Sequence, residues 1–85
     1  MKKNILITGV AGFIGSKVAE RFKNKNFKII GVDDLSTGNL KNIPTGIRFI
    51  RGDLSQKKVI SLLPKKCYQI FHLAGQSSGE ISFDD

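Results

Sequence analysis

The first apolar segment of the chain reads Asn4-Ile5-Leu6-Ile7-Thr8-Gly9-Val10-Ala11-Gly12-Phe13-Ile14-Gly15. Residues 4–8 form an apolar, β-branched-rich run without alternation, which is typical of a strand buried on both faces of a parallel sheet. After the glycines, apolar residues recur at helical spacing, at Phe13, Ile14, Val18 and Phe22. This order predicts a buried strand, a glycine loop and an amphipathic helix whose apolar face holds those four residues.

The rest of the chain continues the alternation of strands and helices. A polar turn ends the predicted helix, and three further strand-like runs follow it at residues 27–32, 47–51 and 69–73. Ser55 is expected to cap one or two helical turns that stop before Pro64. The prediction is an α/β protein: a Rossmann-type parallel sheet with flanking helices, truncated after about four strands in the order 3-2-1-4.

Length and composition describe one small domain that spans residues 1–85, with 40% hydrophobic and 25% charged residues. Its apolar runs are far shorter than the ~20 residues of a membrane-spanning helix, and no secretory cleavage site follows Met1, so no membrane partner is expected. Cys67 and His72 are the single cysteine and histidine, which leaves no internal disulfide and no Cys/His metal cluster. A reducing, cytoplasmic location fits this composition.

Fourteen Lys and Arg against seven Asp and Glu give a formal net charge of +7. A basic nucleic-acid-binding domain would need these charges clustered on one face beside aromatic platforms. The lysines are instead scattered, and no tract reaches the length of a basic arm. Nucleic acid is therefore not the favoured partner, although it stays an alternative of a different class.

Three glycines, Gly9, Gly12 and Gly15, separate the first strand from the first helix. They would allow a tight turn, close approach of the backbone to a pyrophosphate, and close packing of the helix on the strand. The backbone N–H groups of Phe13 and Ile14 would then face the phosphates at the positive end of the helix dipole. A plain tight turn is the alternative, and the flanking strand and helix favour dinucleotide binding.

Asp33 stands at the carboxyl end of the second predicted strand, roughly 24 residues after Gly9 and close to the ~20 expected for an acid that binds the adenosine ribose. Its carboxylate would accept hydrogen bonds from the ribose hydroxyls and repel a 2′-phosphate, and Asp34 adds to that repulsion. No Lys or Arg lies within residues 8–15 or 33–40 to bind the extra phosphate. The expected cofactor is NAD and not NADP.

Four ordered motifs together resemble the amino-terminal part of the extended short-chain dehydrogenases/reductases, and among them the nucleotide-sugar epimerases and dehydratases of the UDP-glucose 4-epimerase type. The motifs are residues 5–15, Asp33-Asp34-Leu35-Ser36-Thr37-Gly38, Gly52-Asp53-Leu54 and Phe71-His72-Leu73-Ala74-Gly75-Gln76. The resemblance runs essentially from end to end of the chain. It implies an NAD-binding Rossmann domain and, for a whole enzyme, a nucleotide-sugar substrate.

The resemblance also implies which positions contact the cofactor. The glycine loop would meet the pyrophosphate, the loop from Asp33 the ribose and adenosine, residues 53–54 the adenine, and residues 73–76 the nicotinamide half. Taken singly, Leu54 and Leu73 could equally be core residues and Asp53 a turn former. The implied positions are Gly9, Gly12, Phe13, Ile14, Gly15, Asp33, Asp34, Leu35, Thr37, Gly38, Asp53, Leu54, Leu73, Ala74, Gly75 and Gln76.

The chain departs from the family in its catalytic apparatus. Members use a Tyr followed four positions later by Lys, whereas Tyr68, the one tyrosine, has His72 at that position. We therefore expect no catalytic residue here and a truncated amino-terminal piece of a longer enzyme, without its substrate-binding part. His72 is expected to be structural and Cys67 to be no nucleophile. The alternative function is a stand-alone NAD- or nucleotide-binding module without catalysis.

The expected strand order leaves the fourth strand, residues 69–73, at an unprotected edge of the sheet. Sheet faces that later helices would normally cover would also expose apolar side chains. Both features predict self-association through strand pairing or exchange.

Overall fold

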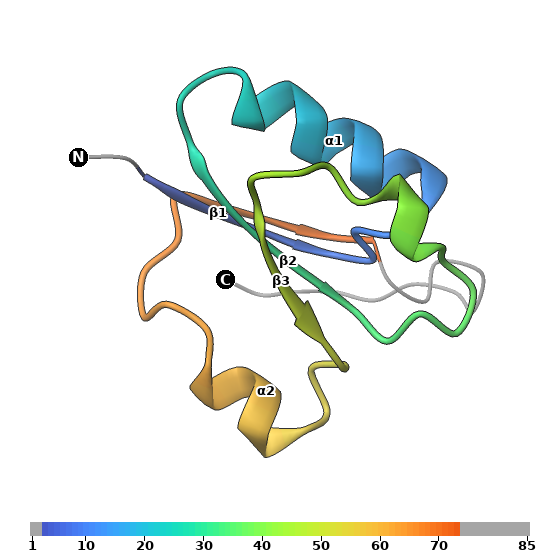
Figure 1. The fold of residues 1–85 in the computed structure, drawn as a ribbon. Coiled ribbons are helices and arrows are strands. Elements are labelled where there is room, and N and C mark those ends of the chain that lie inside the picture. The colour runs from blue at the N-terminus through green and yellow to red at the C-terminus, as the bar shows by residue number, and fades with distance from the viewer. Residues whose placement is uncertain (1–2, 74–85) are drawn as a thin grey trace.

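Residues 3–73, the part of the chain that the computed structural model describes, form a parallel sheet with helices on both faces (Figure 1). The sheet has the order β3-β2-β1-β4, which confirms the predicted topology. The elements in chain order are β1 (Asn4–Thr8), α1 (Phe13–Lys23), β2 (Lys28–Asp33), the 3₁₀-helix η1 (Leu40–Asn42), β3 (Arg48–Arg51), α2 (Lys57–Ser61) and β4 (Gln69–His72).

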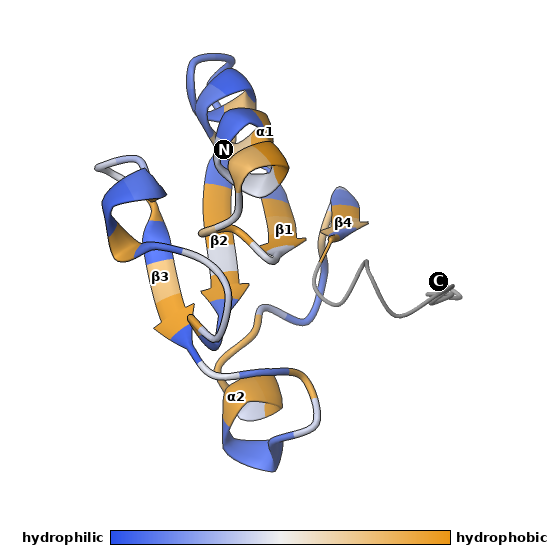
Figure 2. Ribbon diagram, turned by 90° about the vertical axis from the view of Figure 1, so that its right-hand side faces the viewer, coloured by the Kyte–Doolittle hydropathy of each residue, from blue (hydrophilic) through white to orange (hydrophobic). Residues whose placement is uncertain are grey.

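The central strand β1 is buried on both faces, as its unbroken apolar run predicts. Its odd-numbered residues Ile5 and Ile7 pack under α1 with Val10, Ala19 and Ile29. The alternate residues face α2, where Leu6, Ile30, Val32 and Ile50 surround Val59. Figure 2 shows these hydrophobic strands between the two helices. The two small cores meet back to back across β1 and β2.

The predicted apolar face of α1 is wrong at its start. Phe13 and Ile14 are 73% and 63% exposed, while Gly15 and Ala19 are buried and Val18 packs at the edge of the core. The first turn of α1 follows the glycine loop beyond the end of β1, so the sheet does not cover it. The buried stripe therefore begins at Gly15, where small residues let the helix approach the strands closely.

The predicted cap of the second helix is also wrong. Gln56, and not Ser55, occupies the N-cap position of α2, and it makes no side-chain cap bond. The backbone N–H and the hydroxyl of Ser55 instead donate to Asp53, whose carboxylate closes a turn two residues earlier. The helix ends before Pro64, as predicted.

Strand β4 pairs with β1 alone and is an edge of the described sheet. Aromatic rings on the α1 side join it to the rest of the domain. The ring centroid of Phe22 lies 5.4 Å from that of Phe71 and 5.5 Å from that of Phe27. The ring of Phe27 in turn stacks on that of Tyr68, with 5.5 Å between the centroids. Tyr68 and Ile70 remain 58% and 38% exposed. The edge position was predicted correctly, and pairing of two chains along β4 stays a prediction.

Within residues 3–73, no helix has both the length and the apolar character that crossing a membrane requires.

Candidate functional site

The glycine loop turns sharply at the carboxyl end of β1. Gly9 has a φ of 77°, in the left-handed region that glycine adopts without strain. Its N–H donates to the Val32 carbonyl at 2.8 Å, and the Gly12 N–H donates back to the Gly9 carbonyl at 3.1 Å. These two bonds fold the loop onto β2 and bring α1 back over the sheet.

Gly15 and Gly12 have different surroundings: Gly15 packs tightly against the loop, and Gly12 has open space beside it. A Cβ at Gly15 would lie 2.1 Å from the Gly9 carbonyl oxygen, so only glycine lets α1 pack this closely on the loop. A Cβ at Gly12 would lie 3.4 Å from the same oxygen and, apart from its chain neighbours and its own helix, would meet no other heavy atom of the described chain within 4 Å. Gly12 thus faces open space at the start of the helix, which leaves room for a ligand.

The amino terminus of α1 has no protein anion in its own first turn. Its N-cap, Gly12, makes no side-chain cap bond, and its first turn contains no acidic residue. The exposure of Phe13 and Ile14 places this turn at the surface. Uncapped N–H groups at the positive end of an 11-residue helix favour an anionic ligand such as a phosphate.

Asp33 ends β2 beside this loop and is 9% exposed. Its Oδ2 accepts the backbone N–H of Ala11 at 2.8 Å, and its Oδ1 accepts that of Leu35 at 2.8 Å. One carboxylate therefore joins the glycine loop to the loop after β2. Each oxygen can accept a second hydrogen bond, so the group can still receive ribose hydroxyls.

The loop after β2 lies against the glycine loop. Gly38 packs on Ala11 so closely that an added Cβ would lie 2.8 Å from the Ala11 Cβ. Leu35 adopts a φ of 65°, which is uncommon for a residue with a Cβ, and its N–H bond to Asp33 supports this conformation. Thr37 is exposed. The structure thus brings Asp33, Leu35 and Gly38 together with the glycine loop, and their contact with a cofactor stays a prediction.

Ser36 lowers the pKa of the Asp34 carboxyl, first through its backbone N–H at 2.9 Å and then through its hydroxyl at 2.8 Å. We expect Ser36→Ala to raise that pKa part of the way toward the usual 3.8, because the backbone bond remains. The charged form holds this turn, so the turn should loosen as the pH falls through the folded-state pKa. A carboxyl NMR titration measures the shift, and an unchanged Asp34 would contradict the assignment.

The motif Gly52-Asp53-Leu54 follows β3 at the same edge of the sheet. The Gly52 N–H donates to the Asp33 carbonyl at 3.0 Å, which places Asp53 directly after it. The Asp53 carboxylate accepts a hydrogen bond from the backbone N–H of Ser55, and the backbone N–H of Asp53 donates to Gln56 Oε1 at 3.0 Å. Leu54 is half-buried against the α2 core, so it is at least partly a packing residue.

Strand β4 brings its end next to that of β1. The Leu73 N–H donates to the Thr8 carbonyl at 3.0 Å, and Leu73 packs against the core under α1. His72 Nδ1 lies 2.7 Å from Thr8 Oγ1, so the imidazole is hydrogen-bonded, and its structural role stays a prediction. The remaining implied positions, Ala74, Gly75 and Gln76, lie outside the described residues.

Among residues 3–73, no three His, Cys, Asp or Glu side chains gather as a metal site would require. Burial raises the pKa of the Cys67 thiol, so the thiol is protonated at neutral pH and is a poor nucleophile.

One part of the site has no signal in the sequence. The carbonyl of Ala11 accepts the Asn39 N–H at 3.1 Å and the Asn42 side-chain amide at 2.9 Å. Asn42 lies 31 residues from Ala11, in a segment whose residues predict only an irregular connection. A contact of this kind depends on how the chain folds back, which local patterns do not describe.

The fold and the glycine loop define a Rossmann-type α/β domain. Residues 5–85 match the NAD dependent epimerase/dehydratase family, and the chain belongs to that family.

Relatives with known names support this assignment. The chain is 37% identical over 86 residues to the UDP-glucose 4-epimerase of Mycolicibacterium smegmatis, a match that covers 94% of this chain and 28% of the relative. An epimerase structure from Methanothermobacter thermautotrophicus matches with a TM-score of 0.79 and 32% identity, over 86% of this chain and 23% of that one. The UDP-glucose 4-epimerase of Thermus thermophilus in complex with NAD matches with a TM-score of 0.60 and 40% identity, over 65% of this chain and 18% of that one. The chain spans about a quarter of the length of such relatives.

Proposed function

We propose that this chain binds NAD through its ADP half and forms the cofactor-binding part of a nucleotide-sugar epimerase or dehydratase. The observation that carries the proposal is the Asp33 carboxylate, held 2.8 Å from the backbone of the glycine loop beside an uncapped helix terminus. Hydrogen-bond donors for a pyrophosphate and an acceptor for ribose hydroxyls thus stand side by side at the carboxyl edge of a parallel sheet, where this fold binds dinucleotides.

Each group has a task that fits its surroundings. The first N–H groups of α1 would hold the pyrophosphate, and the open space at Gly12 would let it approach the backbone. Asp33 would accept the ribose hydroxyls with its remaining lone pairs. The Asp53 carboxylate, at the end of β3, would accept the exocyclic amine of adenine. Together these residues bind and orient the cofactor and perform no proton transfer.

Bound NAD would supply a hydride acceptor and donor for a sugar substrate. The sequence contains no Tyr-x-x-x-Lys, so we propose that these 85 residues hold the cofactor and contribute no catalytic acid or base. The nucleotide-sugar substrate is proposed from the activities named for the relatives, among them the UDP-glucose 4-epimerase of M. smegmatis.

The proposal is tested by calorimetric titration of the chain with NAD⁺, NADP⁺, ADP-ribose and nicotinamide mononucleotide. We expect saturable binding of NAD⁺ and ADP-ribose. NADP⁺ should bind at least about tenfold more weakly, because its 2′-phosphate would meet the charges of Asp33 and Asp34. Nicotinamide mononucleotide lacks the adenosine, so it should neither bind the chain nor displace ADP-ribose. A folded chain that ignores ADP-ribose, or that prefers NADP⁺, would refute the proposal.

A further inference from the structure

Three hydrogen bonds fix the backbone on both sides of Ala11, a residue with no exposed surface. Its N–H donates to Asp33 Oδ2 at 2.8 Å. Its carbonyl accepts from the Asn39 N–H at 3.1 Å and from Asn42 Nδ2 at 2.9 Å. Both lone pairs of that oxygen are therefore in use, and two of the three donors or acceptors are side chains from outside the glycine loop.

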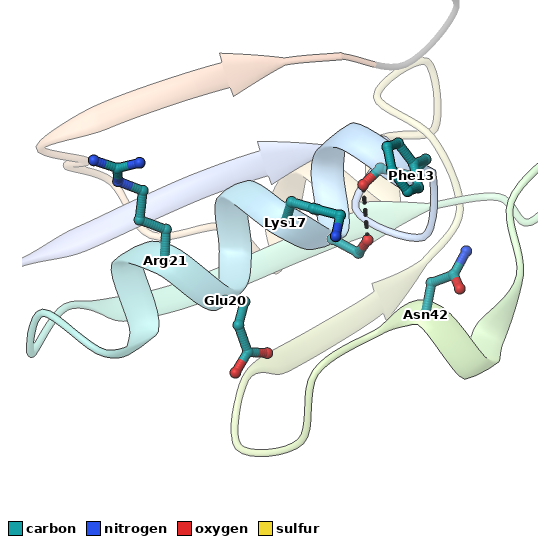
Figure 3. Close-up of a pocket in the computed structure, with 6 residues that line it drawn as sticks. Phe13, Lys17, Glu20, Arg21 and Asn42 are labelled. Atoms are coloured by element: carbon teal, nitrogen blue, oxygen red, sulfur yellow. Dashed lines mark hydrogen bonds between the residues drawn. The ribbon is translucent and has the colours of Figure 1, made fainter.

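The 3₁₀-helix η1 aims the Asn42 side chain at this carbonyl. The Asn39 side chain caps η1 by accepting the Lys41 N–H at 2.9 Å, and the Asn42 N–H donates to the Asn39 carbonyl at 2.9 Å. This short turn places Asn42 across a solvent-open groove from Phe13 and Lys17 of α1 (Figure 3). The side chain of Asn42 is exposed to solvent on the side away from Ala11.

The carbonyl that Asn42 holds belongs to the same rigid peptide plane as the N–H of Gly12. That N–H donates to the Gly9 carbonyl, and Gly12 is the N-cap of α1. If this plane rotates, the glycine turn opens and the start of the helix changes direction. The donor from Asn42 therefore acts on the peptide plane that leads into the first N–H groups of α1, whereas Asp33 accepts the N–H of the preceding peptide plane.

We propose that Asn42 is a positioning residue of the cofactor site: through the Ala11 carbonyl, its side-chain amide holds the glycine loop in the shape that binds a pyrophosphate. The inference rests on the proposed binding of NAD and deepens it. It distinguishes Asn42 from a residue that only stabilises the fold. A purely structural role would change the melting temperature and leave the preference among ligands of the folded chain unchanged.

The experiment compares Asn42→Ala and Asn42→Asp with the unmodified chain and with Asn4→Ala. Asn42→Asp keeps the shape of the side chain but loses the N–H donor. Asn4→Ala is the matched control, because Asn4 Nδ2 donates to the Lys66 carbonyl at 3.2 Å, at the opposite end of β1. NMR titrations with ADP-ribose and with adenosine give the affinities. Amide exchange at Gly12 reports the loop without any ligand.

We expect both Asn42 variants to bind ADP-ribose about three- to tenfold more weakly, the range for one lost hydrogen bond, with adenosine affinity within about twofold. Exchange of the Gly12 amide should become faster in both, and Asn4→Ala should change neither readout. Equal losses for the two ligands, or unchanged Gly12 exchange, would overturn the inference. If the unmodified chain fails to bind ADP-ribose, the proposed function fails instead, and the Gly12 exchange still decides whether Asn42 positions the loop.

Discussion

Gly15→Ala is expected to remove a large part of the free energy of unfolding of this domain. The new Cβ would lie 2.1 Å from the Gly9 oxygen, 2.9 Å from the Gly9 carbonyl carbon and 3.0 Å from the Val10 Cα. All three are backbone atoms, so no side chain can rotate away, and α1 would have to leave the sheet. We expect a loss of more than about 3 kcal/mol, a large part of the stability of a domain this small. Circular dichroism during urea or thermal unfolding measures it.

Gly12→Ala is the matched control for this prediction. At Gly12 the added Cβ would only touch the Gly9 oxygen at 3.4 Å, and the backbone, with φ −80° and ψ 171°, suits alanine. Its unfolding free energy should stay within about 1 kcal/mol of the unmodified chain, since no close contact is created. A Gly15→Ala chain that melts like Gly12→Ala would show that α1 has room to move.

Asp33→Ala should lose both NAD⁺ affinity and stability. Two ribose hydrogen bonds to a charged acceptor, at about 1.5 kcal/mol each, correspond to roughly 100-fold in affinity. The variant also leaves the N–H of Ala11, a fully buried residue, without its partner, which costs about 1–3 kcal/mol. Calorimetry with NAD⁺ and urea unfolding measure the two effects separately.

Asp34→Ala is the comparison variant, because this neighbouring carboxylate is exposed and, among residues 3–73, accepts its hydrogen bonds from Ser36 in its own turn. It should weaken NAD⁺ binding and lower stability less than Asp33→Ala does, because its hydrogen bonds to Ser36 are exposed to solvent. If Asp33→Ala lowers stability but binds NAD⁺ normally, Asp33 stabilises the loop and does not bind the ribose. If both variants behave alike, the charge of the region matters more than the position of either group.

The sheet could be predicted from the sequence because its strands carry unbroken apolar runs. The composition of residues 4–8 and 27–32 predicts buried parallel strands. The structure confirms both strands and places β2 one residue later than predicted, at Lys28–Asp33. The position of Asp33 followed directly, since it terminates that run. The glycines were equally clear, because a strand and a helix flank them.

Each misplaced residue has its own physical cause. The helical period shows that Phe13 and Ile14 could share a face with Val18, but it does not show that the sheet ends before the first turn of α1. Ser55 suits a cap, yet Asp53 competes for the same hydrogen bonds two residues earlier. The bond between Asn42 and Ala11 spans the fold, so no local pattern predicts it.

The position of β1 between β2 and β4 determines the order in which the parts of the sheet can form during synthesis on the ribosome. Residues 4–33 contain β1, the glycine loop, α1, β2 and Asp33, so this whole unit is synthesised before η1 and β3. The second partner of β1 arrives only with Gln69. Because chains emerge amino terminus first, we expect the glycine loop and the Asp33 carboxylate to meet while one edge of the central strand is still open. A nascent chain would therefore have its glycine loop and Asp33 in place before it has a finished sheet.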